Sequence, residues 1–255
     1  MIASGLGGSA KTTTAVRLAE TLTALRVPAG VVDLSPYPTA GSLVVANGVP
    51  VAGGRGASTP ITARSVLKPY EDRLKVMFVD TGRLDDPALV PWTTLCDGLL
   101  LTTRGDRFSL AALEGLGPSL QKVRALNPDM EFLGFLPVMV SPNDSAAVDD
   151  LKRAAAKYLL PVVVPADAWE WRRSHAGCIE GLETAPAAGQ PEPPADRAHR
   201  DLARFVMTKF ALEPETEAVM AAAAAPKETG LVSRLWKLAG KALGPKATVT
   251  AEARP

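Results

Sequence analysis

Short apolar runs alternate along the chain with segments whose apolar residues recur at helical spacing. Runs of roughly four to eight apolar residues are typical of strands buried on both faces. The predicted strands are 1–3, 30–36, 75–82, 98–102, 132–140 and 160–164, and the predicted helices are 15–22, 110–126, 146–158 and 197–210. This alternation predicts an α/β fold with a mainly parallel sheet, helices on both faces, and ligands at the carboxyl ends of the strands.

The remaining segments have the composition of connections. Residues 46–64 are rich in Gly, Pro and Ala and are predicted to be irregular, and 185–194 is predicted to be a loop. A low-complexity Ala/Glu/Pro stretch follows the last predicted helix of the body. We therefore divide the chain into a domain at 1–212, a linker at 213–230, an amphipathic helix at 231–244 and a flexible tail at 245–255.

Composition and charge exclude several classes of protein. Of the 255 residues, 47% are hydrophobic and 22% charged, which excludes wholesale disorder and a collagen-like repeat. Lys and Arg total 28 and Asp and Glu 27, so binding to nucleic acid or an anionic membrane requires a local basic patch. Cys96 and Cys178 are too few for a disulfide framework. With no apolar run near membrane-spanning length, we expect a cytoplasmic protein.

A glycine-rich loop links the first predicted strand to the first predicted helix. The segment 5–12 places Gly7 and Gly8 ahead of Lys11 and Thr12 at the helix start. Backbone N–H groups converge in such a loop, and with a lysine and hydroxyls at a helix N-terminus they form a phosphate-binding site. Ala10 stands where the strict G-x-x-x-x-G-K-[ST] pattern has its last glycine.

Here the sequence resembles the ParA/MinD family of deviant Walker A ATPases over residues 1–210. Residues 7–13 match the family's loop, 33–37 its first switch segment, and 76–80 its Walker B strand, which ends in Asp80. Downstream, 127–134 resembles the segment before the sixth strand, and 163–165 resembles the strand end beside adenine. The resemblance implies a P-loop NTPase-like fold with ATP and Mg²⁺ as cofactors.

The resemblance assigns roles to individual residues. Lys11 would bridge the β- and γ-phosphates, Thr12 would bind Mg²⁺ directly, and Asp33 and Asp80 would reach the metal through water. Lys11 and Asp33 are also the residues it implies for hydrolysis. The nucleotide-binding set that it implies is Gly7, Gly8, Ser9, Ala10, Lys11, Thr12, Thr13 and Pro165.

The chain departs from the family at three positions besides the length of its first strand. Leu6 replaces the signature lysine that reaches across a dimer to the partner's phosphates, and Ser35 replaces the aspartate that orients the attacking water. Alanine at position 10 should cost on the order of 1 kcal/mol if φ is positive there. We expect a weak Mg-dependent ATPase at most. Arg104, Arg107 and Lys152 are candidates for the missing charge, and the first strand is either short or begins upstream of Met1.

Two basic surfaces are candidates for binding a larger partner. Arg197, Arg200 and Arg204 fall on one face of a predicted helix, and Arg172 and Arg173 precede it, which indicates nonspecific DNA contact. A solvated helix face with Asp196 and Asp201 as partners is an equal alternative. In the C-terminal segment, Leu231, Leu235, Trp236 and Leu243 form an apolar stripe among basic residues, which suits an anionic membrane, a partner protein or docking on the body.

Together these patterns favour a ParA-like nucleotide-switch ATPase that positions or partitions a cargo. ATP would promote a homodimer, the dimer would bind a nucleoid or membrane surface, and an unidentified activating partner would trigger hydrolysis. The first alternative is a non-hydrolysing adaptor that keeps the fold and ATP binding. The second is a small-molecule enzyme on the same P-loop fold, such as a ligase.

Overall fold

The computed structural model describes residues 1–35, 39–44, 48–141, 145–168, 172 and 189–224. Its strands are β1 Ile2–Ser4, β2 Ala29–Asp33, β3 Val51–Gly53, β4 Val76–Arg83, β5 Gly98–Thr103, β6 Glu131–Val140 and β7 Val164–Pro165. Its helices are α1 Lys11–Ala24, α2 Ala40–Leu43, α3 Pro60–Leu67, α4 Val90–Thr93, α5 Arg107–Glu114, α6 Gly117–Leu126, α7 Ser145–Ala155, α9 Pro194–Lys209 and α10 Glu217–Ala224. Short 3₁₀ turns occupy Pro87–Leu89 and Ala156–Tyr158.

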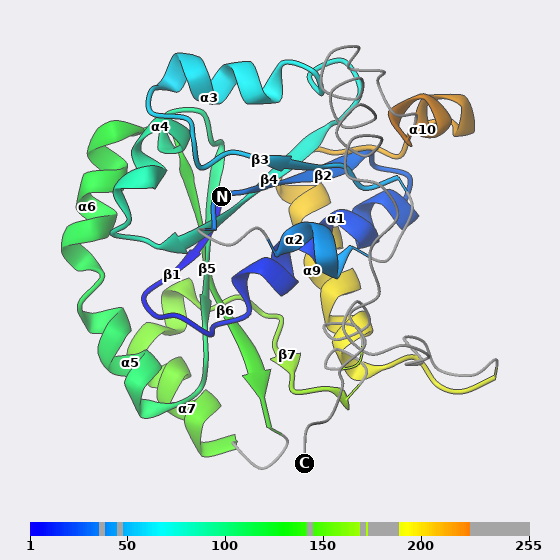
Figure 1. Ribbon diagram of the computed structural model, residues 1–255. Helices are drawn as coiled ribbons and strands as arrows, with labels where there is room; N and C mark the ends of the chain where they lie inside the picture. The colour runs from blue at the N-terminus through cyan, green and yellow to red at the C-terminus, as the bar shows by residue number, and fades with distance from the viewer. Residues whose placement is uncertain (36–38, 45–47, 142–144, 169–171, 173–188, 225–255) are drawn as a thin grey trace, which may run out of the picture. The chain divides into compact units, whose positions relative to one another are not determined.

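The strands form one sheet in the order β3-β2-β4-β1-β5-β6-β7, and every neighbouring pair is parallel. Helices cover both faces (Figure 1), as expected when parallel strands are joined by helical crossovers. The predicted fold class is therefore confirmed, and β1 lies at the centre of the sheet, between β4 and β5. Among the described residues no helix combines the length and apolarity needed to cross a membrane.

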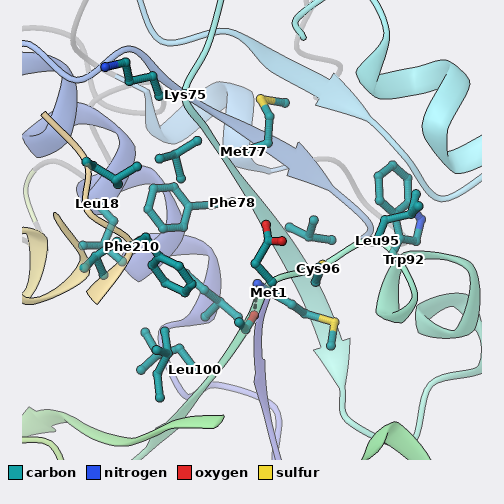
Figure 2. Close-up of a pocket in the computed structure, with 18 of the residues that line it drawn as sticks. Met1, Leu18, Lys75, Met77, Phe78, Trp92, Leu95, Cys96, Leu100 and Phe210 are labelled. Carbon is teal, nitrogen blue, oxygen red and sulfur yellow. Dashed lines mark hydrogen bonds between the residues drawn. The ribbon is translucent and has the colours of Figure 1, made fainter. Parts of the chain in front are cut away.

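A separate apolar core lies against each face of the sheet. Alternate residues of a strand point to opposite faces, so Ile2 packs with α1 and α9 while Ala3 packs on the other side. Leu18 of α1 and Leu202 of α9 are fully buried in the first core, and Trp92 of α4 is fully buried in the second. The sheet is therefore covered by apolar side chains on both faces (Figure 2).

Two predicted segments have a different structure from the one expected. The prediction of a strand at 160–164 is wrong except for Val164, because β7 is only Val164–Pro165; Pro161 lacks the N–H that a ladder needs. The prediction that 46–64 is irregular is wrong for β3 and α3. Thr59 caps α3 through a capping box with Thr62, and Pro60 occupies its first turn, a helix-starting position for proline.

The segment 110–126, predicted as one helix, forms α5 and α6. The helix is interrupted between Glu114 and Gly117. Pro118 lies in the first turn of α6, where no helical hydrogen bond needs its missing N–H.

Part of the predicted linker at 213–230 is helical and bound to the body. Helix α10 lies within it, and Lys75 donates to the Glu213 carbonyl at 3.1 Å and pairs with Glu215. Arg73 donates to the carbonyl of Ala223. Residues 213–224 therefore extend the ordered body beyond the boundary predicted at 212, while 225–255, with the predicted amphipathic helix, lies outside the described residues.

Candidate functional site

The glycine loop between β1 and α1 turns through two left-handed residues. Gly8 has φ of 68° and Ala10 has φ of 51°. Glycine adopts this conformation freely, whereas the Cβ of alanine makes it less favourable by about 1–2 kcal/mol. The sequence analysis expected a cost at Ala10 if φ were positive there, and φ is positive.

Helix α1 begins at Lys11 without a side-chain cap and without an acidic residue in its first turn. The first N–H groups of a helix have no partner within the helix, and the dipole gives this end a partial positive charge. Lys11 itself is partly buried, and burial lowers the pKa of its ammonium, although the charge of Asp80 raises it. The loop therefore presents unmatched donors and a positive charge at one point.

The carbonyl of Leu6 organises the loop. It accepts from the Ser9 hydroxyl at 3.1 Å, from the Lys11 ammonium at 3.4 Å and from the Ser4 hydroxyl. The Thr102 hydroxyl on β5 lies 3.3 Å from that of Ser9 and connects the loop to the neighbouring strand. Because the bond from Lys11 is long, the ammonium can turn toward an anion at little cost.

Asp80 lies in the buried part of β4, opposite Ile2 of β1 and Asp33 of β2. It is 1% exposed, and among the described residues neither of its carboxylate oxygens has a hydrogen-bond partner. Burial raises the pKa of Asp80 to about 6; the nearby Thr12 hydroxyl opposes this, the charge of Asp33 adds to it, and Lys11 opposes it. A buried carboxylate whose one neighbouring donor, the Thr12 hydroxyl, makes no hydrogen bond of normal geometry is unfavourable, and a cation bound beside it would remove that penalty.

Asp33 is equally buried but fully hydrogen-bonded. One oxygen accepts from the Ser35 N–H at 2.8 Å and from the Ser35 hydroxyl, and the other accepts from the N–H groups of Thr39 and Ala40, each at 2.9 Å. These four bonds use about all the acceptor capacity of a carboxylate. Asp33 therefore holds the loop after β2 against the start of α2.

Lys11, Thr12 and Asp33 all lie near enough to Asp80 to affect the pKa of its carboxyl. Their roles in binding phosphate and Mg²⁺ stay predictions. Pro165 ends β7 opposite Val140, at the end of the sheet order beyond β5 and β6. Nothing in the geometry assigns Pro165 a ligand, so its role beside adenine stays a prediction.

The side chains considered for the missing charge have acidic neighbours. Leu6, which the family resemblance places at the signature-lysine position, is partly buried. Arg104 pairs with Asp106 at 3.3 Å, and Lys152 pairs with Asp149 at 3.3 Å. Both ion pairs are exposed to solvent, so each contributes little free energy, and Arg104 and Lys152 can leave their partners easily.

One arginine near the site was missed by the sequence analysis. Arg55, just after β3, donates to the Leu34 carbonyl at 3.0 Å and lies 3.6 Å from the carboxylate of Asp86. It thus joins the loop after β2 to the loop after β4. No local pattern marks this residue, because it lies in a stretch predicted to be irregular.

The arginine face of α9 is largely paired. Arg200 pairs with Glu192, and Arg204 pairs with Asp201 at 3.5 Å. Arg197 is exposed. The Arg204 pair fits the alternative of a solvated face, in which Asp201 was a predicted partner, while the partner of Arg200 is a residue that the sequence analysis did not choose. DNA binding by this face stays a prediction.

Of the other predicted site residues, Arg172 is described and partly buried. The side chain of Arg107, all of Arg173, and the apolar stripe of the C-terminal segment lie outside the described residues; that stripe is Leu231, Leu235, Trp236 and Leu243.

No protein-family model matches the chain, and no curated protein matches it in sequence. Solved structures do match its fold. Septum site-determining protein MinD from Pyrococcus horikoshii with Mg-ADP is 17% identical, with a TM-score of 0.61, covering 82% of this chain and 95% of that one. Cobyrinic acid a,c-diamide synthase from Mycobacterium smegmatis with ADP and magnesium is 15% identical, with a TM-score of 0.60, covering 84% and 98%.

An Asp-to-Ala variant of Cyanothece McdA with ATP is also similar, at 15% identity and a TM-score of 0.56, covering 85% of this chain and 97% of that one. These likenesses, at such low identity, concern the fold. The chain has the α/β fold of the P-loop NTPases, over nearly the full length of the neighbours it matches.

Proposed function

We propose that this protein is a Mg·ATP-dependent nucleotide-switch protein of the ParA/MinD kind. The observation that carries the proposal is the partnerless buried carboxylate of Asp80 beside Thr12 and Lys11, at the uncapped start of α1. An ammonium, free helix N–H groups, a hydroxyl and a carboxylate are the donor and acceptor set that a metal-bound triphosphate requires. The neighbours with bound nucleotide and magnesium support the same ligands.

Each residue of the site has a distinct task in this proposal. Lys11 and the first N–H groups of α1 bind the phosphates, and Lys11 leaves the Leu6 carbonyl to do so. Thr12 and Asp80 would hold Mg²⁺, which would supply positive charge for the phosphate oxygens. Mg²⁺ would offset the buried negative charge of Asp80. Binding of Mg·ATP should therefore raise the free energy of unfolding of the protein.

The site also explains why we expect slow hydrolysis. The residue in the water-orienting position, Ser35, donates its N–H and hydroxyl to Asp33, and a hydroxyl is a weaker base than a carboxylate. The four bonds to Asp33 would have to rearrange before it could act on water. Without a partner to complete the site, we propose that the protein remains in its ATP-bound form for long periods.

The biological role that we propose is the positioning of a cargo. One neighbour is called a septum site-determining protein and another a cell division ATPase, and the family resemblance implies an ATP-dependent homodimer. In this proposal the dimer binds a nucleoid or membrane surface through the arginine face of α9 or the basic segment at 231–244. A synthase has the same fold, so the fold alone does not assign this role.

Calorimetric titration with Mg·ATP tests the nucleotide proposal. Lys11→Ala should weaken binding about 100-fold or more, because it removes the ammonium that meets the phosphates. Lys68→Ala is the matched control, since Lys68 is exposed at the end of α3, and it should bind like the wild type. Equal affinity of Lys11→Ala and the control would overturn the assignment of the loop.

Sedimentation velocity tests the switch itself. The protein with Mg²⁺ and a non-hydrolysable ATP analogue should sediment as a dimer, and with ADP as a monomer. Nucleotide binding with no change of sedimentation would contradict the switch and would leave a nucleotide-binding adaptor or a small-molecule enzyme as the alternatives.

A further inference from the structure

Helix α6 lies over β5 and β6 with a cavity of about 760 Å³ between them, here called the α6 cavity. The helix lines it with Leu120, Arg124 and Asn127, which follow one another at intervals of four and three residues and so share one face. Leu99 and Phe132, each the second residue of its strand, line the side of the sheet. Native cores are packed without voids of this size, whereas ligand pockets have such volumes.

A bulge in β6 brings two phenylalanines to the α6 cavity. Two consecutive residues of β5 lie opposite Phe132 and Gly134, so Leu133 between them is an extra residue in the strand. In a regular strand Phe132 and Phe135, three positions apart, would lie on opposite faces. With the bulge both belong to the same apolar core, and their ring centroids are 5.3 Å apart in an edge-to-face arrangement.

Gly134 allows a third ring to join these two. Its φ is 126°, and a Cβ at this position would collide with the carbonyl oxygen of Tyr158. Glycine therefore lets the 3₁₀ turn Ala156–Tyr158 approach β6 closely. The centroid of the Tyr158 ring lies 5.8 Å from that of Phe132, and Tyr158 is 49% exposed. The rings of Phe132, Phe135 and Tyr158, here called the aromatic wall, all line the cavity.

Asn127 supplies a fixed hydrogen-bond acceptor. Its amide nitrogen donates to the carbonyls of Thr93 and Cys96, each at 2.9 Å, which uses both of its N–H groups and holds the side chain in place. Its amide oxygen accepts no hydrogen bond from any residue that the structure describes. A ligand with an N–H or O–H beside Asn127 would therefore gain a hydrogen bond that needs no rearrangement of the protein.

Arg124 supplies a positive charge at the same end of the cavity. It precedes Asn127 by one helical turn, it is exposed, and within the described part of the chain it forms no ion pair. Glu114, the other charged side chain of the lining, lies beyond the opposite end of α6. Because a guanidinium binds a carboxylate through charge-assisted hydrogen bonds, an anionic group is favoured at the Arg124 end and disfavoured at the other.

We propose that the α6 cavity is a binding site for a small aromatic carboxylate that also carries an N–H or O–H donor. Its ring packs against the aromatic wall, its carboxylate pairs with Arg124, and its donor meets the amide oxygen of Asn127. The site lies where β5 and β6 begin, at the edge of the sheet opposite to the glycine loop. The inference is therefore independent of the nucleotide proposal.

Equilibrium dialysis of the full chain against indole-3-propionate tests the ligand class. We expect one molecule to bind per chain, with a Kd of about 1 mM or lower. Indole-3-propionamide lacks the negative charge and should bind about tenfold more weakly. Naphthalene-1-propionate keeps the charge and the ring system but lacks the N–H, and it should bind about threefold more weakly.

Variants test the residues. Arg124→Gln should weaken binding of the acid about tenfold and leave binding of the amide unchanged, because only the acid carries the charge that the guanidinium meets. Lys122→Gln is the matched control, since Lys122 is exposed on the same helix but does not line the cavity, and it should bind like the wild type. Tyr158→Ser should weaken both ligands by removing a ring of the aromatic wall. Lys11→Ala should bind both like the wild type.

Three results would overturn the proposal. The first is the absence of saturable binding of indole-3-propionate. The second is an affinity for the acid that is the same in Arg124→Gln as in Lys122→Gln, or the same for the acid as for its amide, because either would remove the carboxylate contact. The third is loss of binding in Lys11→Ala, which would assign the ligand to the nucleotide site instead.

Discussion

Replacing Asp80 by asparagine should stabilise the nucleotide-free protein at neutral pH while weakening Mg-dependent nucleotide binding. The pKa of Asp80 rises from its ordinary value of 3.8 to about 6, chiefly through burial. Since one pKa unit corresponds to about 1.4 kcal/mol, the ionised carboxylate destabilises the folded state by about 3 kcal/mol. Asparagine has the shape of the protonated acid and removes this charge.

The sign of the effect depends on pH. Above pH 6 the carboxylate is ionised in the folded and unfolded states, and the full penalty is present. As the pH falls from about 6 to about 4, the folded protein takes up a proton before the unfolded chain does, and the penalty disappears. The advantage of Asp80→Asn should therefore be large at pH 7.5 and small at pH 4.

Thermal unfolding in EDTA, without nucleotide, measures this difference. For a chain of this size about 3 kcal/mol corresponds to a Tm increase of roughly 6–12 °C at pH 7.5. Asp33→Asn is the matched comparison and should lower stability by about 1–3 kcal/mol, because an amide cannot accept all four bonds of that carboxylate. Asp85→Asn, at an exposed residue, should change little.

Two outcomes would refute the reasoning. A Tm of Asp80→Asn equal to or below that of the wild type at pH 7.5 would mean that the carboxylate is not penalised in the folded state. A stabilisation of the same size at pH 7.5 and pH 4 would mean that its cause is packing rather than charge.

Three further predictions concern turnover and surfaces. The purified protein should hydrolyse ATP far more slowly than about 1 s⁻¹, the lower end of typical enzymes, and Ser35→Asp should increase the rate; turnover at or above 1 s⁻¹ in the wild type would contradict our account of the switch loop. A variant ending at Pro226 should keep ATP affinity but lose co-sedimentation with anionic vesicles, and equal sedimentation of both proteins would exclude membrane binding by 231–244. Arg197→Glu should weaken any DNA binding and its dependence on salt, whereas unchanged binding would assign α9 to the solvated face.

The sequence predicted best where one local pattern determines the structure. The apolar runs that became β4 and β6 need no distant information, because runs of this length are typical of buried strands. The glycine loop likewise predicted a helix start at Lys11 and Thr12. Asp33 and Asp80, each placed after an apolar run, were predicted at the carboxyl ends of two strands, and they lie in register on β2 and β4.

The sequence predicted less well where distant contacts decide. β3 forms because Val51 finds an edge of β2, and Gly and Pro around it conceal this in the sequence. Arg55 reaches the site only through the folded chain. The contrast between a satisfied Asp33 and an isolated Asp80 depends on which backbone N–H groups lie near each carboxylate, which spacing does not reveal.

The position of the three-residue strand β1 has a consequence for cooperativity. The sheet consists of two blocks, β3-β2-β4 and β5-β6-β7, and β1 is the seam between them. The same short stretch of chain binds both blocks, through the Thr81 hydroxyl to the Ile2 carbonyl on one side and the Leu100 N–H to the Met1 carbonyl on the other. Local unfolding of the sheet should begin at β1, and the glycine loop follows β1 directly in the chain. A ligand that stabilises the loop should therefore also stabilise β1 between the two blocks. Binding at the loop should slow hydrogen exchange in the middle of the sheet.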